Sequence, residues 1–525
     1  MSPTDPTNPH SGFPSWIVLA GAVVIPLVYV PTLATRFDFI DDGNLVYPAP
    51  AMGLGDRLGL VWDKIVANYD HLGPFRPVLW AHWELVAELT GGDERAWRVA
   101  RLVWSMFATG MLLALMRELR LPAWPSLLAA ALAMWNPYRN EIWTSLTLSE
   151  GVAMPYALGA LWCAARANRS RRSWPWDVAS ALGVLAAMGC KNTFAAIVPA
   201  QLYLRMWADG AGWREGLLIH WRRAALLSLT LLAPIGHYIY FRLNWHPGQY
   251  PPTGVTVAQL GRMVSALGGA MSLDFMAVGI ALALLALVAI LVIPSAARNR
   301  PGAGKGEQIP RCSRSDKTVW LTATLVVAFG IGIYLPMPAV SGRYTMPAVW
   351  GLDLAFAGLL AMLFAAPAVR WRRWATVAVV GGLAAVAVAN LGKQAKFAAR
   401  SDLLWQALRH VERSTGGPQR VLWVSGPALN GEEGIHFHWH LHARGHGRIA
   451  VDLVDERGAA EERCELPKAA GPATMAMTGT PEPPPGGPWR LERAFHSQFW
   501  AGRRQYDCYL WSAETPAVNA SSKRR

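Results

Sequence analysis

The feature that most constrains this chain is a series of apolar stretches, most of which run for about 20 residues with few charges, enough for a helix to cross a bilayer. Backbone polar groups inside a bilayer must be satisfied within the segment, which favours helices. Only 16% of the 525 residues are charged, against about 25% in soluble proteins. We therefore predict a mainly α, polytopic membrane protein with about eleven spanning helices. The predicted spans are 16–34, 97–116, 123–137, 145–165, 176–190, 193–208, 222–242, 272–294, 318–336, 346–367 and 373–391.

The net charge of +14 has two readings, nucleic-acid binding or a topology signal. Basic clusters occupy every second loop between the apolar stretches, as in the run Arg166–Arg172. The positive-inside rule accounts for this alternation, so we predict no nucleic-acid partner and a cytoplasmic N-terminus. Met1–Ser15 lacks Lys and Arg, so the first apolar stretch is predicted to be a retained helix rather than a signal peptide. The loops 35–96 and 243–271 and the C-terminal tail then lie outside the cytoplasm.

The chain changes character after the last apolar stretch. We predict a membrane domain over 1–391, a small α/β domain over 392–515 and a disordered tail over 516–525. A helix is expected at 399–414, strands at 420–425, 448–454 and 505–512, and a loop at 467–488. Cys464 and Cys508 both fall in this domain, where they either form a disulfide or stay unpaired.

Two adjacent carboxylates, Asp41 and Asp42, follow the first predicted span. They have two readings, a hydrated loop that caps the helix or a general base at the membrane surface. The predicted topology puts further polar residues on the same side, and each alone also reads as a loop or snorkelling charge. Arg and Lys suit the phosphate of an anionic lipid. These further residues are His71, Arg76, Arg139, Glu150, Lys191, Arg343 and Tyr344.

A histidine cluster, His436-Phe437-His438-Trp439-His440-Leu441-His442, lies in the predicted outer domain. On a strand the alternate histidines share one face. On a helix His436 and His440 are four residues apart, a metal-ligand spacing. A metal site is the minor reading, with His436 and His440 as its candidates. Packing, or a polar face toward the membrane domain, is the other reading.

Four short motifs give the chain a resemblance to the GT-C superfamily of polytopic glycosyltransferases, in particular its protein O-mannosyltransferase-like branch. The segment Phe39-Ile40-Asp41-Asp42 resembles the acidic motif of the first loop, and Phe75-Arg76-Pro77 opens an amphipathic helix predicted at 76–90. Lys191-Asn192 resembles a Lys-Glu motif, with Asn in place of Glu, and Gly342–Pro347 is similar to an Arg-Tyr segment before a late helix.

The resemblance implies an inverting transferase that moves a sugar from a polyprenyl-phosphate donor in the membrane to an extracytoplasmic glycan, lipid or protein acceptor. Asp41 would be the base and Asp42 its support. Donor phosphate binding would fall to Arg343 and Lys191, with Arg76 and Arg139, and other substrate contacts to His71, Tyr344 and Glu150. No cofactor is required, although a divalent metal that bridges carboxylate and phosphate is an alternative. The location implied is the cell or plasma membrane, with the C-terminal domain outside.

Two other classes of function compete with this one. A transporter or flippase for a lipid-linked glycan predicts charged residues deep inside spans and internal repeats. A non-catalytic assembly subunit predicts that the two acidic residues are dispensable.

Overall fold

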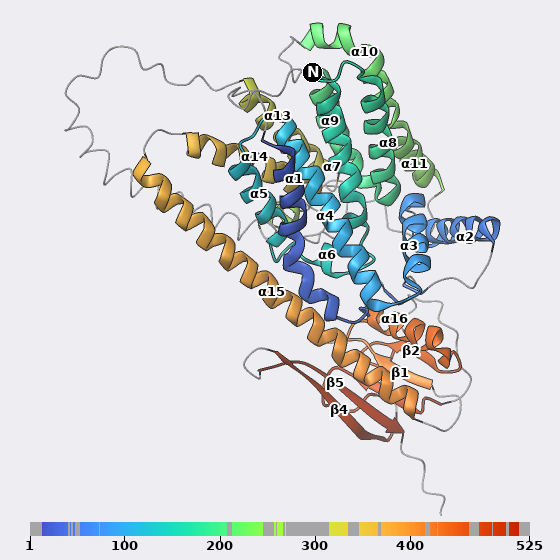
Figure 1. Cartoon of the computed structure of the whole chain (residues 1–525). Helices are drawn as coiled ribbons and strands as arrows, with labels where there is room; N and C mark the ends of the chain where they lie inside the picture. Colours follow the sequence, from blue (N-terminus) through green and yellow to red (C-terminus); the bar gives the residue numbers. More distant parts are fainter. Residues whose placement is uncertain are drawn as a thin grey trace, which may run out of the picture.

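The computed structural model describes residues 13–39, 42–43, 46–47, 53–72, 74–206, 213–244, 257–258, 260–265, 268, 314–333, 346–365, 369–414, 420–427, 429–460, 472–485, 487–499 and 503–513. A helical bundle carries a small sheet domain at one end (Figure 1). The prediction of a mainly helical chain with a small α/β domain is confirmed.

The described part of the bundle follows the apolar stretches closely. Its elements are α1 Ser15–Val24, η1 Ile25–Ala34, α2 Leu54–Leu72, α3 Pro77–Thr90, α4 Glu94–Glu118, α5 Ala123–Trp135, α6 Glu141–Thr144, α7 Ser149–Ala167, α8 Trp174–Cys190, η2 Asn192–Ile197, α9 Val198–Met206, α10 Trp213–Leu229, α11 Leu232–Leu243, α13 Arg314–Gly332, α14 Met346–Ala365 and α15 Val369–Arg413. The expected helix at 76–90 is α3, whereas α2 in the same loop was not predicted.

Two helices of the described part, Ser15–Ala34 and Glu94–Glu118, are long and apolar enough to cross a membrane. Several others present apolar side chains outward; Trp174, Leu232 and Ile239 are each at least half exposed. Outward apolar faces of this kind are what lipid tails cover. We therefore treat the bundle as membrane-embedded, while the predicted total of about eleven spans stays a prediction.

The segment predicted as one span over 222–242 is not a single uninterrupted helix, and the span itself stays a prediction. The chain forms α10 and α11 there, separated at Thr230–Leu231. Pro234 lies in the first turn of α11, and a proline has no backbone N–H to donate to the carbonyl four residues before it, which is that of Thr230. The helix therefore ends before the proline and starts again. The predicted span 272–294 and most of the loop 243–271 lie outside the described residues.

Helix α15 joins the bundle to the sheet domain. It runs without interruption for 45 residues, about 68 Å at 1.5 Å per residue. The predicted span 373–391 and the predicted helix 399–414 are thus parts of one helix, which crosses the expected boundary at residue 391. Figure 1 shows it passing from the bundle to the sheet, so a continuous rod links the two.

The C-terminal domain is a five-stranded sheet in the order β2-β1-β3-β5-β4. The strands β1 Arg420–Val424, β2 Ala450–Val454 and β5 Arg503–Ala513 match the predicted strands. Two more were missed, β3 Met475–Thr478 inside the predicted loop and β4 Trp489–Phe499. β1 pairs in parallel with β2 and β3, and β5 pairs antiparallel with β3 and β4.

The histidine cluster forms helix α16, Gly431–Leu441, which connects β1 to β2. A capping box starts it: the Glu433 amide donates to Asn430 Oδ1 at 2.8 Å, and the Asn430 amide donates to Glu433 Oε2 at 2.9 Å. The helix packs closely on the sheet, since a Cβ at Gly434 would lie 2.5 Å from Leu453 Cδ2 and 2.8 Å from Trp423 Cγ. This arrangement aims the remaining face of α16 at the bundle.

Candidate functional site

The segment 36–47, here called the acidic loop, follows η1 and contains Asp38, Asp41 and Asp42. Its described residues lie at the end of the bundle that meets the C-terminal domain (Figure 1). Asp42 is completely buried. Its carboxylate accepts hydrogen bonds from the Asp38 amide at 2.8 Å and from Thr147 Oγ1 at 3.1 Å. Asp41 lies outside the described residues. The second acid of the motif is therefore a fixed, buried carboxylate, which suits the supporting role expected for it.

A third carboxylate, Asp38, lies beside Asp42 and was missed by the sequence analysis. It is 6% exposed, and its carboxylate accepts from the Phe39 amide at 2.7 Å. Burial and the neighbouring Asp42 carboxylate both raise the pKa of Asp38 well above its usual value. A shift in this direction favours the protonated, uncharged form of the Asp38 carboxyl, because two adjacent buried carboxylates repel each other.

Two arginines of α4 face this carboxyl pair. Arg98 donates to the carbonyls of Thr144 and Arg36, the latter at 2.6 Å, and Arg101 donates to the carbonyls of Ile142 and, at 3.3 Å, Leu148. The two arginines are three positions apart in the sequence, so they lie on one face of α4. Their hydrogen bonds hold the start of the acidic loop, at Arg36, and the segment 142–148 next to the two carboxyl groups. Within the described part of the chain, Nε and Nη1 of Arg101 have no hydrogen-bond partner.

Two predicted site residues, Lys191 and Glu150, form a buried ion pair. Lys191 follows the end of α8, and Glu150 lies in the first turn of α7, where Ser149 Oγ also donates to it at 3.0 Å. Glu150 and Asp42 are among the charged groups around Arg101, which therefore connects the pair to the acidic loop. Asn192 replaces the Glu of the resembled motif, and the lysine finds its carboxylate on another helix instead.

The other predicted residues are more scattered. Arg139 contacts both carboxylate oxygens of Asp353 on α14 at 2.8 Å, with both side chains buried. Arg76 precedes α3 and lies near Cys190, beside Lys191 in sequence. His71 lies in the last turn of α2, and its side chain is outside the described part of the structure, as are Arg343 and Tyr344. The structure thus gathers Asp42, Glu150 and Lys191, and engages Arg139 elsewhere.

The two metal candidates contact the acidic loop instead of each other. His436 Nδ1 accepts from the Gly43 amide at 2.9 Å, and His440 lies 3.0 Å from the Asp38 carbonyl oxygen. The described residues hold no group of three His, Cys, Asp or Glu placed to bind a metal ion. The polar-face reading of the cluster fits this geometry. In the same domain Cys508 is buried and free, and Cys464 lies outside the described residues.

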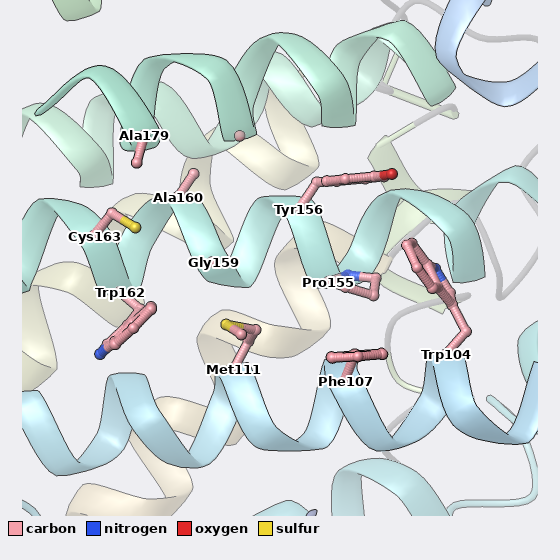
Figure 2. A pocket seen from close by; sticks show the side chains of 11 residues that line it. Trp104, Phe107, Met111, Pro155, Tyr156, Gly159, Ala160, Trp162, Cys163 and Ala179 are labelled. Carbon is pink, nitrogen blue, oxygen red and sulfur yellow. The ribbon is translucent and has the colours of Figure 1, made fainter. Parts of the chain in front are cut away.

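An apolar groove of about 350 Å³ lies between α4, α7 and α8 (Figure 2). Trp104, Phe107 and Met111 line it from α4, and Tyr156 and Gly159 from α7. Trp104 follows Arg101 by three residues, so one end of the groove lies one helical turn from the arginine pair. The Trp104 indole donates to the Val152 carbonyl at 3.2 Å, which holds the two helices together at that end.

Asp38, Arg98 and Arg101 are the residues that sequence reasoning missed. Asp38 belongs to the same loop, only three positions before Asp41. The two arginines lie at the start of the predicted span 97–116, and no role was assigned to them. A usable signal was present, because Arg95, Arg98 and Arg101 recur every three residues at the start of this apolar stretch and so share one side of a helix.

No family model matches this chain, and no curated protein matches it. Among solved structures, the chain is similar to ArnT from Cupriavidus metallidurans bound to undecaprenyl phosphate, with 14% identity, 94% of this chain and 98% of that chain covered, and a TM-score of 0.43. The apo state of the same protein is similar at 14% identity and a TM-score of 0.43, with 94% of this chain and 97% of that chain covered. A likeness at this level does not establish a shared fold, so the function proposed below rests on the residues of this chain.

Proposed function

We propose that this chain is a membrane glycosyltransferase of the GT-C type, which moves a sugar from a polyprenyl-phosphate donor to an acceptor outside the cytoplasm. The observation that carries the proposal is the buried layer of charges where the acidic loop, α4 and α7 meet. Asp42 lies there beside Arg98 and Arg101, next to the Lys191–Glu150 pair. Acid and arginine groups held together at a membrane face suit transfer from a lipid phosphate.

Arg101 is the donor-phosphate ligand that this geometry favours. Its Nε and Nη1 are buried and unsatisfied within the described part, and buried N–H groups without an acceptor are costly. A phosphate oxygen would satisfy them. The apolar groove that opens one turn away suits the hydrocarbon chain of the same lipid, since it is lined almost entirely by apolar side chains.

The proposed reaction has one displacement step. The acceptor hydroxyl oxygen attacks the anomeric carbon, the bond from that carbon to the phosphate oxygen breaks, and the bonding electron pair leaves on the phosphate. Asp41 takes the hydroxyl proton. Asp42 holds the loop in place through its hydrogen bonds to the Asp38 amide and Thr147. The arginine charges stabilise the departing phosphate. Attack from the opposite side inverts the anomeric configuration, and cationic side chains make a metal ion unnecessary for this step.

The test is sugar transfer by the purified full chain from a panel of radiolabelled polyprenyl-phosphate sugars. A mannosyl donor belongs in the panel because of the motif resemblance. Transfer should fall about 10²–10⁴-fold in Asp41→Asn and also fall in Asp42→Asn, while the matched control Asp63→Asn, an exposed acid on α2, should match wild type. Transfer that survives in both site variants would refute the assignment. A chain that transfers no sugar but moves a lipid-linked glycan across vesicles would be a transporter.

A further inference from the structure

We propose that the C-terminal domain sets the position of the acidic loop through helix α16, with His436 and His440 as positioning residues. Both histidines hydrogen-bond to the acidic loop in the structure. The effect of these bonds on sugar transfer rests on the function proposed above. The two histidines lie four residues apart, so they share the face of α16 that is turned to the loop.

The hydrogen bonds of His440 fix a single form of its ring. Nε2 lies 3.0 Å from the Asp38 carbonyl oxygen, which can only accept, so Nε2 carries the hydrogen and donates. Nδ1 then has a free lone pair and accepts from the Tyr47 hydroxyl at 2.9 Å. Burial lowers the pKa of His440 to about 3, so the ring is neutral at physiological pH. One imidazole thereby ties together two points of the loop, on either side of Asp41 and Asp42.

His436 holds a third point. Its Nδ1 accepts from the Gly43 amide at 2.9 Å, directly after Asp42. The approach is so close that a Cβ added to Gly43 would lie 2.8 Å from the His436 carbonyl oxygen and 2.9 Å from its Cα. Only glycine fits there without movement of one backbone. The loop and the helix therefore meet backbone to backbone immediately beside the acidic pair.

Aromatic packing and α15 complete the attachment. The His440 ring stacks on the Phe37 ring, with 6.2 Å between the ring centroids. It forms an edge-to-face contact with the Phe39 ring, with 4.9 Å between the centroids. On α15, Trp405 Nε1 and Ser401 Oγ donate to the Phe37 carbonyl at 2.9 and 2.7 Å. The loop segment around Asp38 is thus enclosed by two helices from the C-terminal part of the chain, more than 360 residues later in the sequence.

This enclosure gives the C-terminal domain a defined task. A carboxylate that acts on a bound substrate must be placed within a fraction of an ångström, and a shift of about 1 Å costs on the order of 10² in rate. The loop has no regular secondary structure of its own among its described residues, so its placement depends on these outside contacts. Loss of the contacts should lower kcat more than it raises KM for the donor.

The experiment compares full-length variants in detergent by hydrogen–deuterium exchange of peptides that cover 36–47, together with transfer kinetics. His440→Phe keeps the ring but loses both hydrogen bonds, and Tyr47→Phe removes one bond from the loop side. His436→Asn keeps an acceptor near the Nδ1 position, whereas His436→Leu does not. His442→Gln, at an exposed histidine that follows α16, is the control.

We expect exchange in the loop to rise at least tenfold in His440→Phe and His436→Leu, with strands β1 and β2 unchanged, and less in Tyr47→Phe. His436→Asn and His442→Gln should resemble wild type. Unchanged loop exchange in both His440→Phe and Tyr47→Phe would overturn the proposal. Faster loop exchange in a chain that shows no sugar transfer at all would support the positioning contact and reject the glycosyltransferase assignment instead, so the two failures are distinguishable.

Discussion

The buried ion pair between Arg139 and Asp353 offers the most direct test of how the bundle is held together. It joins the turn after α5 to α14 across 214 positions in sequence. The two side chains are 1% and 3% exposed, and both carboxylate oxygens lie 2.8 Å from Arg139 Nη1. Removal of one partner from such a pair leaves the other charge buried, which costs about 3–5 kcal/mol.

We therefore expect Asp353→Asn to lower the free energy of unfolding by about 3–5 kcal/mol, because the amide cannot balance the guanidinium charge. The double variant Arg139→Met/Asp353→Val removes both charges and replaces each side chain with an apolar one of similar size. It should be close to wild type in stability, or more stable by about 1–4 kcal/mol, since neither charge then needs to be desolvated.

The assay is denaturant unfolding in mild detergent, followed by tryptophan fluorescence, for wild type, Asp353→Asn, the two single variants Arg139→Met and Asp353→Val, and their double variant. The coupling energy from this cycle should exceed about 2 kcal/mol in favour of the double variant. A loss below about 1 kcal/mol in Asp353→Asn, with additive single variants, would refute the reasoning. The same proteins test the expected donor role of Arg139, because a double variant that folds and still transfers sugar excludes that role.

Three further results are expected. Gly151→Ala should lower stability by about 1–3 kcal/mol in thermal unfolding, because the new Cβ would clash with the Arg101 guanidinium and lie 2.5 Å from the Ile142 carbonyl; a wild-type midpoint would contradict this. Arg101→Lys should raise KM for the lipid donor tenfold or more in transfer assays, since lysine lacks the planar donor fork, and equal KM values would remove Arg101 from the phosphate site. The pKa of His440 falls from about 6.5 in the unfolded chain to about 3, so the folded state binds fewer protons and stability declines as pH drops from 6.5 toward 3. Urea unfolding at pH 7 and at pH 4.5 should show a smaller loss of unfolding free energy for His440→Phe than for wild type. An equal loss in the two proteins would exclude His440 as the source of the pH dependence.

Part of the candidate site was predictable from local pattern and charge alternation. The outer side of the bundle was expected to collect Asp42, Glu150 and Lys191, and the structure brings these three to one end. The lysine–glutamate pairing was not foreseen, because the two residues come from different helices. Arg139 shows the converse, since its side chain pairs with Asp353, a residue within the predicted span 346–367 to which no role was assigned.

The sequence by itself determined the elements with a strong period or a long apolar run, such as α4, β1, β2 and β5, because burial of one face leaves a readable spacing. It left α16 undecided, since alternating histidines fit a strand as well as a helix. Only the tertiary structure decided that question, through the Asn430–Glu433 cap and the packing of Gly434 on the sheet. It alone placed His436 and His440 against the acidic loop, because such contacts depend on how α15 carries the C-terminal domain back to the start of the chain, and no local spacing records that distance.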